Sequence, residues 1–360
     1  MSVNLATGQL APDTVRQDVL AVVAELLHDC EATWAADGAG AVHVRSHGRE
    51  LLDELRRWFA TEGKMLRARF CHLGHAAAGA SSDRHVVRLG AALELLHTFA
   101  IVQDDVMDAS RVRRGVPTTH VRFEHAHAES GWRGERRRFA EASAVLVGDL
   151  AHALANRLVG ELPATVRTLW ASLCQELVLG QYLDVRGTAA GADQAGYAEL
   201  VALLKSARYT VSRPLQLGAA LTGARPQLVE ALGRFGESLG LAFQLRDDLL
   251  GVFGDSGLTG KPVGDDLRDG KPTLLLALTT RRAPVDALPL LAKIGTPTLS
   301  EEEVGAVTRL CISTGAMREV SSRIDRAVAE AHRVLQTASL PPEVSDSLAR
   351  LADDVAWRHR

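Results

Sequence analysis

The segment LELLHTFAIVQDDVMD, residues 93–108, decides the fold of this chain, because a long apolar run ends in three aspartates. Asp104 and Asp108 are four positions apart, so in a helix they lie on one face with Cβ atoms roughly 5–6 Å apart. Like charges this close repel, and the apolar flank excludes water, so a cation is expected between them. Oxygen-only ligands favour Mg²⁺, which usually acts together with substrate phosphates.

A second acidic motif follows another apolar run. The segment FQLRDDLLGVFGD, residues 243–255, contains Asp247 and Asp248. Two buried helices that each end in aspartates predict a cavity with acid on facing walls, which is how helix bundles build metal sites.

The hydrophobic pattern is helical along nearly the whole chain, so we expect an all-α fold. The predicted helices cover about 14–37, 47–60, 64–79, 83–108, 136–160, 164–186, 196–223, 226–253, 272–282, 300–314, 316–338 and 342–357. No alternating strand pattern, repeat or linker is evident, which predicts one domain over residues 1–360 with residues 1–14 as a flexible extension. The longest irregular stretches, about 109–135 and 254–271, directly follow the acidic motifs, as expected for loops that close over a site.

Composition excludes several classes of function. The net charge of −3 gives no case for nucleic-acid binding. No stretch of about 18 uncharged apolar residues exists, so no transmembrane segment is expected. The four cysteines lack the spacing of a zinc site or a disulfide framework, which fits a reducing cytoplasm; they are Cys30, Cys71, Cys174 and Cys311.

Basic residues gather beside the acidic motifs. The segment RVRRGVPT, residues 111–118, places arginines where they can bind a diphosphate in bidentate fashion. The segment EGKMLR, residues 62–67, puts Lys64 and Arg67 in the first turn of a helix, whose N-terminus attracts anions. Lysine is rare in this chain, yet Lys205, Lys261 and Lys271 lie in similar glycine-rich or acid-neighbouring segments. Two cationic phosphate sites and one acidic metal site imply two diphosphate substrates.

These motifs together resemble the trans-isoprenyl diphosphate synthases of the polyprenyl synthetase family, most of all bacterial geranylgeranyl diphosphate synthases. The matching pieces, in the family's order, are EGKMLR, LELLHTFAIVQDDVMD, RRGVPT, GQYLD, KSARYT, FQLRDDLLGVFGD and GKPVGDDLRDGKPT. The resemblance implies the isoprenoid synthase type I fold, a large antiparallel helix bundle with a central active-site cavity, in a cytoplasmic homodimer. It implies Mg²⁺-dependent head-to-tail condensation of isopentenyl diphosphate with dimethylallyl, geranyl or farnesyl diphosphate, releasing diphosphate.

The resemblance also assigns roles to residues. Isopentenyl diphosphate would be held by Lys64, Arg67, His97 and Arg114. The allylic diphosphate would be contacted by Arg113, Lys205, Ser206, Gln244, Lys261 and Lys271. Three Mg²⁺ ions would be bound by Asp104, Asp108, Asp247 and Asp248. Catalysis would rest on Asp104, Asp108, Lys205, Asp247 and Lys271.

Product length is expected to depend on the positions one helical turn before Asp104. Ala100 is small and Phe99 is large, a pair that by resemblance goes with geranylgeranyl diphosphate as the main product. A farnesyl or longer polyprenyl product is the alternative within the family.

Two other functions stay open. A class I terpene cyclase shares the first acidic motif but needs Asn, Ser and Glu at four-residue spacing, whereas the asparagines here are only Asn4 and Asn156. A non-catalytic synthase subunit would have lost part of the motifs. The chain does depart from the family at Gly251, where an aspartate usually ends the second motif, and Asp255 or Asp265 could compensate.

Overall fold

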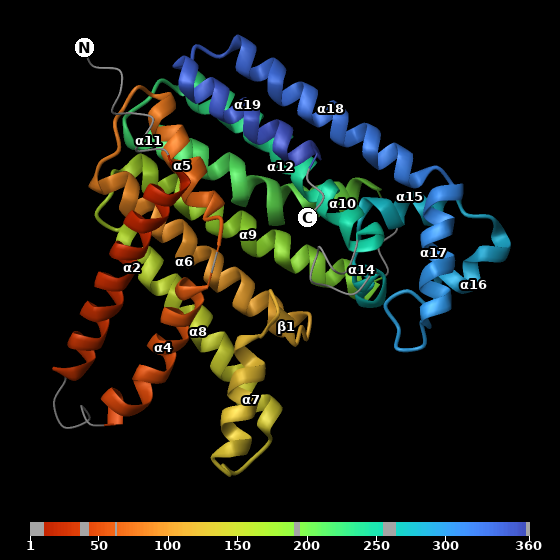
Figure 1. The fold of residues 1–360 in the computed structure, drawn as a ribbon, viewed down its shortest axis with the longest axis horizontal. Helices are drawn as coiled ribbons and strands as arrows, with labels where there is room; N and C mark the ends of the chain where they lie inside the picture. Colours follow the sequence, from red (N-terminus) through yellow and green to blue (C-terminus); the bar gives the residue numbers. More distant parts are fainter. Residues whose placement is uncertain (1–10, 37–42, 62, 191–194, 255–263, 358–360) are drawn as a thin grey trace. The chain divides into compact units, whose positions relative to one another are not determined.

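The computed structural model describes residues 11–36, 43–61, 63–190, 195–254 and 264–357, and these are almost entirely helical (Figure 1). Its strands are β1 (Val112–Arg113) and β2 (Val116–Pro117), which pair as a small antiparallel hairpin. The all-α prediction is therefore confirmed. Contacts divide the chain into two compact units, and each is described by itself. The single domain expected from the sequence stays a prediction.

Unit 1 comprises residues 1–167 with 220–222. Its elements are α2 (Pro12–Ala35), the π-helix η2 (Val44–Gly48), α4 (Arg49–Ala60), α5 (Leu66–Ala77), α6 (Arg84–Met107), the β1–β2 hairpin, α7 (Thr119–Glu129) and α8 (Arg136–Val159). The central helix is α6, which packs against α2, α5, α7 and α8. Its start is fixed by Asp83, whose carboxylate accepts the N–H groups of His85 and Val86, as the sequence predicts for an N-cap.

The sequence of α6 is apolar enough for burial on most faces. Leu89, Leu93, Leu95 and Leu96 are fully buried. By length and hydropathy α6 is also the one candidate membrane span among the described helices, and most of its apolar window is buried inside the protein. Burial of this kind is typical of a core helix, and it places the aspartates at the end of a rigid element.

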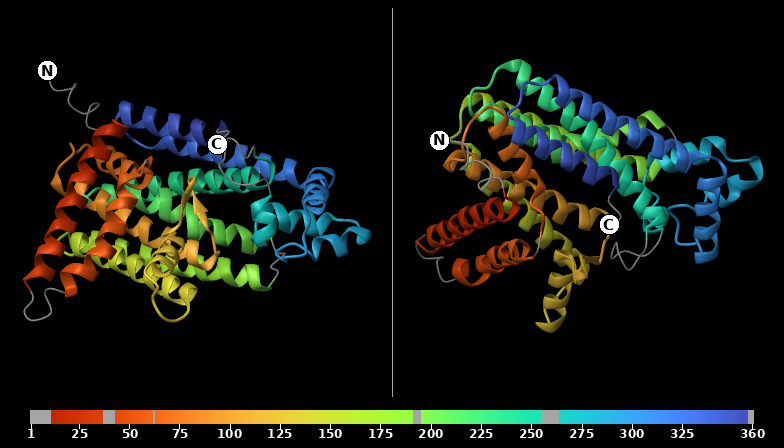
Figure 2. Two further views of the ribbon diagram at one scale, coloured as in Figure 1. Left: turned by 60° about the horizontal axis from the view of Figure 1, so that its bottom comes forward. Right: turned by 45° about the horizontal axis from the view of Figure 1, so that its top comes forward.

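Unit 2 comprises residues 168–219 and 223–360. Its elements are most of α9 (Ala164–Ala190), α10 (Ala195–Val201), the π-helix η3 (Ala202–Ser212), α11 (Arg213–Leu221), α12 (Pro226–Phe253), α14 (Asp265–Asp269), α15 (Leu274–Arg282), η4 (Val285–Ala287), α16 (Leu288–Leu291), α17 (Glu301–Ser313), α18 (Ala316–Thr337) and α19 (Pro342–Trp357). The central helix is α12, and α18 and α19 lie alongside it (Figure 2).

Glycines allow α12 to approach η3 closely. A Cβ atom on Gly236 would lie 2.4 Å from the Cα of Ser212, and one on Gly240 would lie 2.5 Å from the Cα of Ala207. Because any side chain at either glycine would collide with the η3 backbone, this contact depends on both. It fixes the helix that carries the second acidic motif.

Helix boundaries agree with the sequence prediction to within a few residues, with four corrections. The stretch 254–271, expected to be irregular, contains α14 in its described part. The stretch 109–135 is not wholly irregular, because it contains the hairpin and α7. The expected helix 196–223 is divided into α10, η3 and α11. Residues 1–10 of the expected N-terminal extension lie outside the described residues, and α2 already begins at Pro12.

Candidate active site

The first acidic motif separates its aspartates into two environments. Asp105 is fully buried and accepts hydrogen bonds from Arg113, whose Nη2 donates to Oδ1 at 2.7 Å and whose Nε donates to Oδ1 at 2.8 Å and to Oδ2 at 3.1 Å. Burial raises the pKa of the Asp105 carboxyl, although the hydrogen bonds and charge of Arg113 act in the opposite direction. Asp104 and Asp108 are only partly buried, one helical turn apart. The buried aspartate thus anchors an arginine, while its two neighbours keep access to solvent.

The β1–β2 hairpin presents the arginines. Arg114 and Gly115 form its two-residue loop, and both have positive φ, 52° and 77°. This is the backbone of a type I′ turn, whose twist matches that of the paired strands. The hydroxyl of Thr118 donates to the carbonyl of Ser110 at 2.7 Å, which closes the base of the hairpin. Arg113 and Arg114 therefore lie on a hydrogen-bonded hairpin rather than on an irregular loop.

Cationic side chains surround His97 on α6. Its pKa lies well below the ordinary value, because the ring is buried and because Arg67, Arg114 and Arg113 repel a further positive charge. Burial lowers the pKa of Arg114 as well, and the charges of Arg113 and Arg67 add to the effect. So much positive charge around a neutral imidazole is a suitable environment for a polyanion.

The segment before α5 joins this cluster. Gly63 lies against Arg114, since a Cβ atom on Gly63 would be 3.5 Å from Arg114 Nη1. Lys64 is exposed and directly follows Gly63, but α5 begins at Leu66, so Arg67 lies in the first turn of that helix and Lys64, contrary to the prediction, does not. Glu94, buried on α6, accepts the N–H of Ala68 at 3.1 Å and so ties α6 to α5, the helix of Arg67. The structure thus brings Arg67, His97 and Arg114 together. Lys64 follows Gly63, the residue that lies against Arg114.

The two residues expected to set product length occupy different surroundings. The ring of Phe99 stacks on His152 of α8, with centroids 4.8 Å apart and planes inclined by 25°. One turn further on, Gln103 donates to Asp149 of α8 at 3.0 Å. Phe99 is therefore held by α8, whereas Ala100 is partly buried on the adjoining face of the helix.

The second acidic motif lies in unit 2. Asp248 is buried, and its pKa is raised well above the ordinary value by burial, against a hydrogen bond from Gln244 at 2.7 Å. The negative charges of Asp266 and Asp247 raise that pKa further, and the charge of Lys271 lowers it. Asp247 is exposed on the neighbouring face. Gln244, which was expected to contact diphosphate, donates to Asp248 here.

The lysines of unit 2 are paired with carboxylates. Lys205 Nζ lies 2.5 Å from Asp184 Oδ2 on α9, and Lys271 Nζ lies 3.8 Å from Asp266 Oδ1. Ser206 is partly buried next to Lys205. Lys261 and Asp255 lie outside the described residues, and the side chain of Asp265 is not described either.

The carboxylates of the two acidic motifs fit Mg²⁺. No group of three or more Asp, Glu, His or Cys side chains among the described residues is already gathered around one point. Mg²⁺ does not require one, because it keeps several waters and is usually bound by one or two carboxylates plus substrate phosphates. Asp104 with Asp108, and Asp247 with Asp248, supply the oxygen donors that such an ion prefers.

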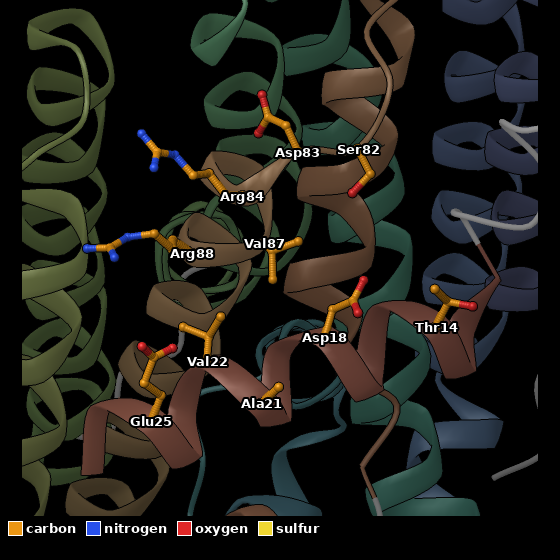
Figure 3. Close-up of a pocket in the computed structure, with 10 residues that line it drawn as sticks. All are labelled: Thr14, Asp18, Ala21, Val22, Glu25, Ser82, Asp83, Arg84, Val87 and Arg88. Atoms are coloured by element: carbon orange, nitrogen blue, oxygen red, sulfur yellow. The ribbon is translucent and has the colours of Figure 1, made fainter. Parts of the chain in front are cut away.

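A surface pocket of about 630 Å³ lies elsewhere in unit 1 (Figure 3). It is lined by residues of α2, including Asp18 and Glu25, and by the start of α6, including Arg84 and Arg88. Because α6 has 24 residues, its start is roughly 36 Å from the aspartates at its end. This pocket is therefore separate from the candidate site.

The sequence profile of the polyprenyl synthetase family matches residues 49–311, a range that includes both acidic motifs and the cationic cluster. The chain belongs to the polyprenyl synthetase family. A solved geranylgeranyl pyrophosphate synthase from Corynebacterium glutamicum, complexed with isoprenyl diphosphate and magnesium, is 34% identical. Its TM-score is 0.87, with 97% of this chain and 99% of that chain covered.

Other members of the polyprenyl synthetase family are named for different products. The geranylfarnesyl diphosphate synthase of Aeropyrum pernix is 30% identical over 82% of this chain and 90% of that protein. The nonaprenyl diphosphate synthase of Mycobacterium tuberculosis is 31% identical over 88% of this chain and 89% of that protein. Membership therefore establishes a prenyltransferase of this family and leaves the product length to be determined.

Two residues that the sequence analysis left without a role stand out in the polyprenyl synthetase site. Asp184 pairs with Lys205, and Asp266 lies beside Lys271 and against Gly251. Asp184 ends the GQYLD segment, which was a signal of its presence. Asp266 lies in the matching segment GKPVGDDLRDGKPT, but that segment contains three aspartates and does not show which of them approaches Gly251.

Proposed function

We propose that this chain condenses isopentenyl diphosphate head to tail with allylic diphosphates, with geranylgeranyl diphosphate as the main product and diphosphate released. The observation that carries the proposal is the cationic cluster around His97 on the same helix as Asp104 and Asp108. Arg67 and Arg114 would hold a diphosphate directly, while the aspartates would hold one through metal. One phosphate site formed by arginines and one formed through metal support a reaction between two diphosphates rather than the cyclisation of a single diphosphate.

Each group of residues has a distinct task in this reaction. Arg67, Arg114 and Lys64 bind the isopentenyl diphosphate, and the neutral ring of His97 offers it a hydrogen bond without adding charge. Asp104 and Asp108 in unit 1, and Asp247 in unit 2, would hold Mg²⁺, an ion that would supply positive charge for a departing diphosphate. Lys205 and Lys271 would add positive charge to the same leaving group. Water must be kept from the allylic cation, since the cation would otherwise become an alcohol.

Phe99 supports a product of limited length. The allylic tail would start at the metal site, pass Ala100 and meet the ring of Phe99. That ring is held in place by stacking on His152. A ring that is packed on a second helix cannot easily turn aside. The longer-chain alternative would require the tail to bypass it.

The expected homodimer has support on α9. Val178, Tyr182 and Val185 are 56%, 62% and 42% exposed and follow one another at helical spacing on one face. An exposed apolar stripe of this kind marks an interaction surface. We propose that it contacts a second copy of this chain, in a cytoplasmic enzyme.

Product analysis tests the proposal. Purified protein, Mg²⁺ and labelled isopentenyl diphosphate are incubated with dimethylallyl, geranyl or farnesyl diphosphate in separate reactions. We expect all active primers to converge on geranylgeranyl diphosphate, and Phe99→Ala to shift the products to longer chains, since each additional buried CH₂ is favourable by about 0.8 kcal/mol. His152→Ala keeps the Phe99 ring but removes the side chain on which it stacks, so we expect a smaller shift than in Phe99→Ala. A farnesyl or nonaprenyl product from the unmodified protein would contradict the assigned length, and no condensation with any primer would contradict the function.

A further inference from the structure

The place of the missing aspartate in the second motif is filled by another residue. An ideal Cβ atom on Gly251 would lie 1.9 Å from Asp266 Oδ2 and 2.6 Å from Asp266 Cγ. These separations are far below van der Waals contact, so the carboxylate of Asp266 lies where a side chain at position 251 would begin and would have to rotate away to admit one. Gly251 and Asp266 therefore form a matched pair, in which the absence of one side chain makes room for the other.

Backbone contacts on both sides of α14 fix this arrangement. The N–H of Gly264 donates to the carbonyl of Gly251 at 3.2 Å, which ties the start of α14 to α12. The N–H of Gly295 donates to the carbonyl of Leu267 at 3.1 Å, and Gly270, at the other end of α14, packs closely on Gly295. Leu267 is itself fully buried. The approach of Asp266 to Gly251 is thus built into the fold of unit 2.

The carboxylate of Asp266 interacts electrostatically with the aspartates of the second motif. Its charge acts on Asp248 together with that of Asp247. Lys271, expected to contact the leaving diphosphate, lies 3.8 Å from Asp266 Oδ1, and the N–H of Lys271 donates to the carbonyl of Asp266 at 3.1 Å. Asp266 is therefore placed between a metal-binding motif and a diphosphate-binding lysine.

We infer that Asp266 supplies the third carboxylate of the second acidic motif, in place of a side chain at position 251, and helps to hold the Mg²⁺ ion assigned to Asp247. This inference rests on the proposed function, because it assumes that the second motif holds Mg²⁺ with diphosphate. An oxygen donor from a different helix offers the ion the same chemistry as one from α12, since Mg²⁺ depends on its ligand atoms and their geometry.

The test measures the response to Mg²⁺ in two ways. One is the Mg²⁺ concentration that gives half-maximal condensation. The other is the rise in melting temperature when Mg²⁺ and inorganic diphosphate are added together, which needs no turnover. Asp266→Asn keeps the shape of the side chain and removes its charge, and we expect it to raise the half-saturating Mg²⁺ by roughly 10–100-fold, the range found for residues that support a metal site. Asp269→Asn makes the same charge change at an exposed position of α14 and serves as the control.

Moving the carboxylate between the two positions makes the test sharper. Gly251→Asp alone should weaken the Mg²⁺ response, because the new side chain collides with Asp266. The double variant Gly251→Asp with Asp266→Ala should respond to Mg²⁺ better than either single variant, because one carboxylate again fills the shared space.

The inference fails if Asp266→Asn behaves like Asp269→Asn, or if the double variant is no better than Asp266→Ala alone. Failure of the proposed function would be recognised by a different result. The unmodified protein would then show no condensation with any primer, while the melting-temperature response to Mg²⁺ and diphosphate would still report on Asp266.

Discussion

The three aspartates at the end of α6 have different environments. Asp105 is buried and bonded to Arg113, whereas Asp104, whose Oδ2 lies 3.7 Å from Arg113 Nη2, and Asp108 are partly exposed at the spacing that suits a shared metal ion. The sequence does not distinguish adjacent aspartates, but their positions around the helix do, because neighbours along a helix point about 100° apart.

Removing the outward carboxylates should abolish turnover. Asp104→Asn and Asp108→Asn leave the helix intact but remove the negative charge that holds Mg²⁺, so we expect a loss of kcat of at least 100-fold. Steady-state assays over a Mg²⁺ titration measure this, and Asp286→Asn, the same change at an exposed position of η4, is the control. Condensation at an undiminished rate in excess chelator would overturn the metal assignment.

The cationic cluster should act on one substrate. Lys64→Ala and His97→Ala are expected to raise KM for isopentenyl diphosphate about tenfold, which corresponds to about 1.4 kcal/mol of lost binding, and to raise KM for the allylic primer much less. The reason is that His97 interacts with Arg67 and Arg114, and that Lys64 follows Gly63, which lies against Arg114. Initial rates with each substrate varied in turn decide the matter, and a selective loss of allylic affinity would mean that the two sites are assigned backwards.

At the scale of elements, close packing positions the second motif. Helix α12 meets η3 where glycines bring the two backbones together, and α14 is tied to α12 by a backbone hydrogen bond. The carboxylates of α12 and α14 therefore converge through contacts that involve no charge at all.

Filling one of these contacts should destabilise the protein. Gly240→Ala places a methyl group 2.5 Å from the Cα of Ala207, and overpacking of this kind typically costs about 1–3 kcal/mol. Gly196→Ala on α10, where nothing lies within 4 Å of the added methyl, is the matched control and should be neutral or slightly stabilising. Urea unfolding curves of both variants measure the difference. Equal midpoints would show that the α12–η3 contact can relax without loss.

At the scale of the whole molecule, buried histidines link stability to pH. Burial lowers the pKa of His72 and His97. It also lowers the pKa of His120 and His152, which are less deeply enclosed. In the unfolded chain these rings take up protons near pH 6.5, whereas in the folded chain they resist protonation. Their contribution to stability is therefore complete above about pH 6.5 and is lost as the pH falls through the folded pKa.

Folding stability should accordingly decline in mild acid. For His72 and His97 the slope can reach about 1.4 kcal/mol per pH unit for each ring. Urea midpoints between pH 7.5 and pH 5 measure it, and His72→Gln, which is distant in the chain from the acidic motifs, should flatten the slope relative to the unmodified protein. The exposed His125→Gln is the control, and an identical slope in both variants would contradict the assignment to buried rings.

The sequence by itself determined the all-α class, most helix boundaries and the residues of both acidic motifs. Hydrophobic periodicity is local, so a short window of sequence contains the interactions that decide where a helix forms. The helix α7 was missed because its buried face, which includes Phe123 and His127, is interrupted by histidines and arginines, and its end packs on Trp132 and Phe139.

Only the tertiary structure decided which residues share a site. The pairing of Asp105 with Arg113, the stacking of Phe99 on His152 and the entry of Asp266 into the space at Gly251 join residues on different elements. Such contacts depend on how the helices pack, and packing is set by steric fit among side chains far apart in the chain. The family's motifs predict the kind of chemistry, and the fold determines which carboxylate completes each group.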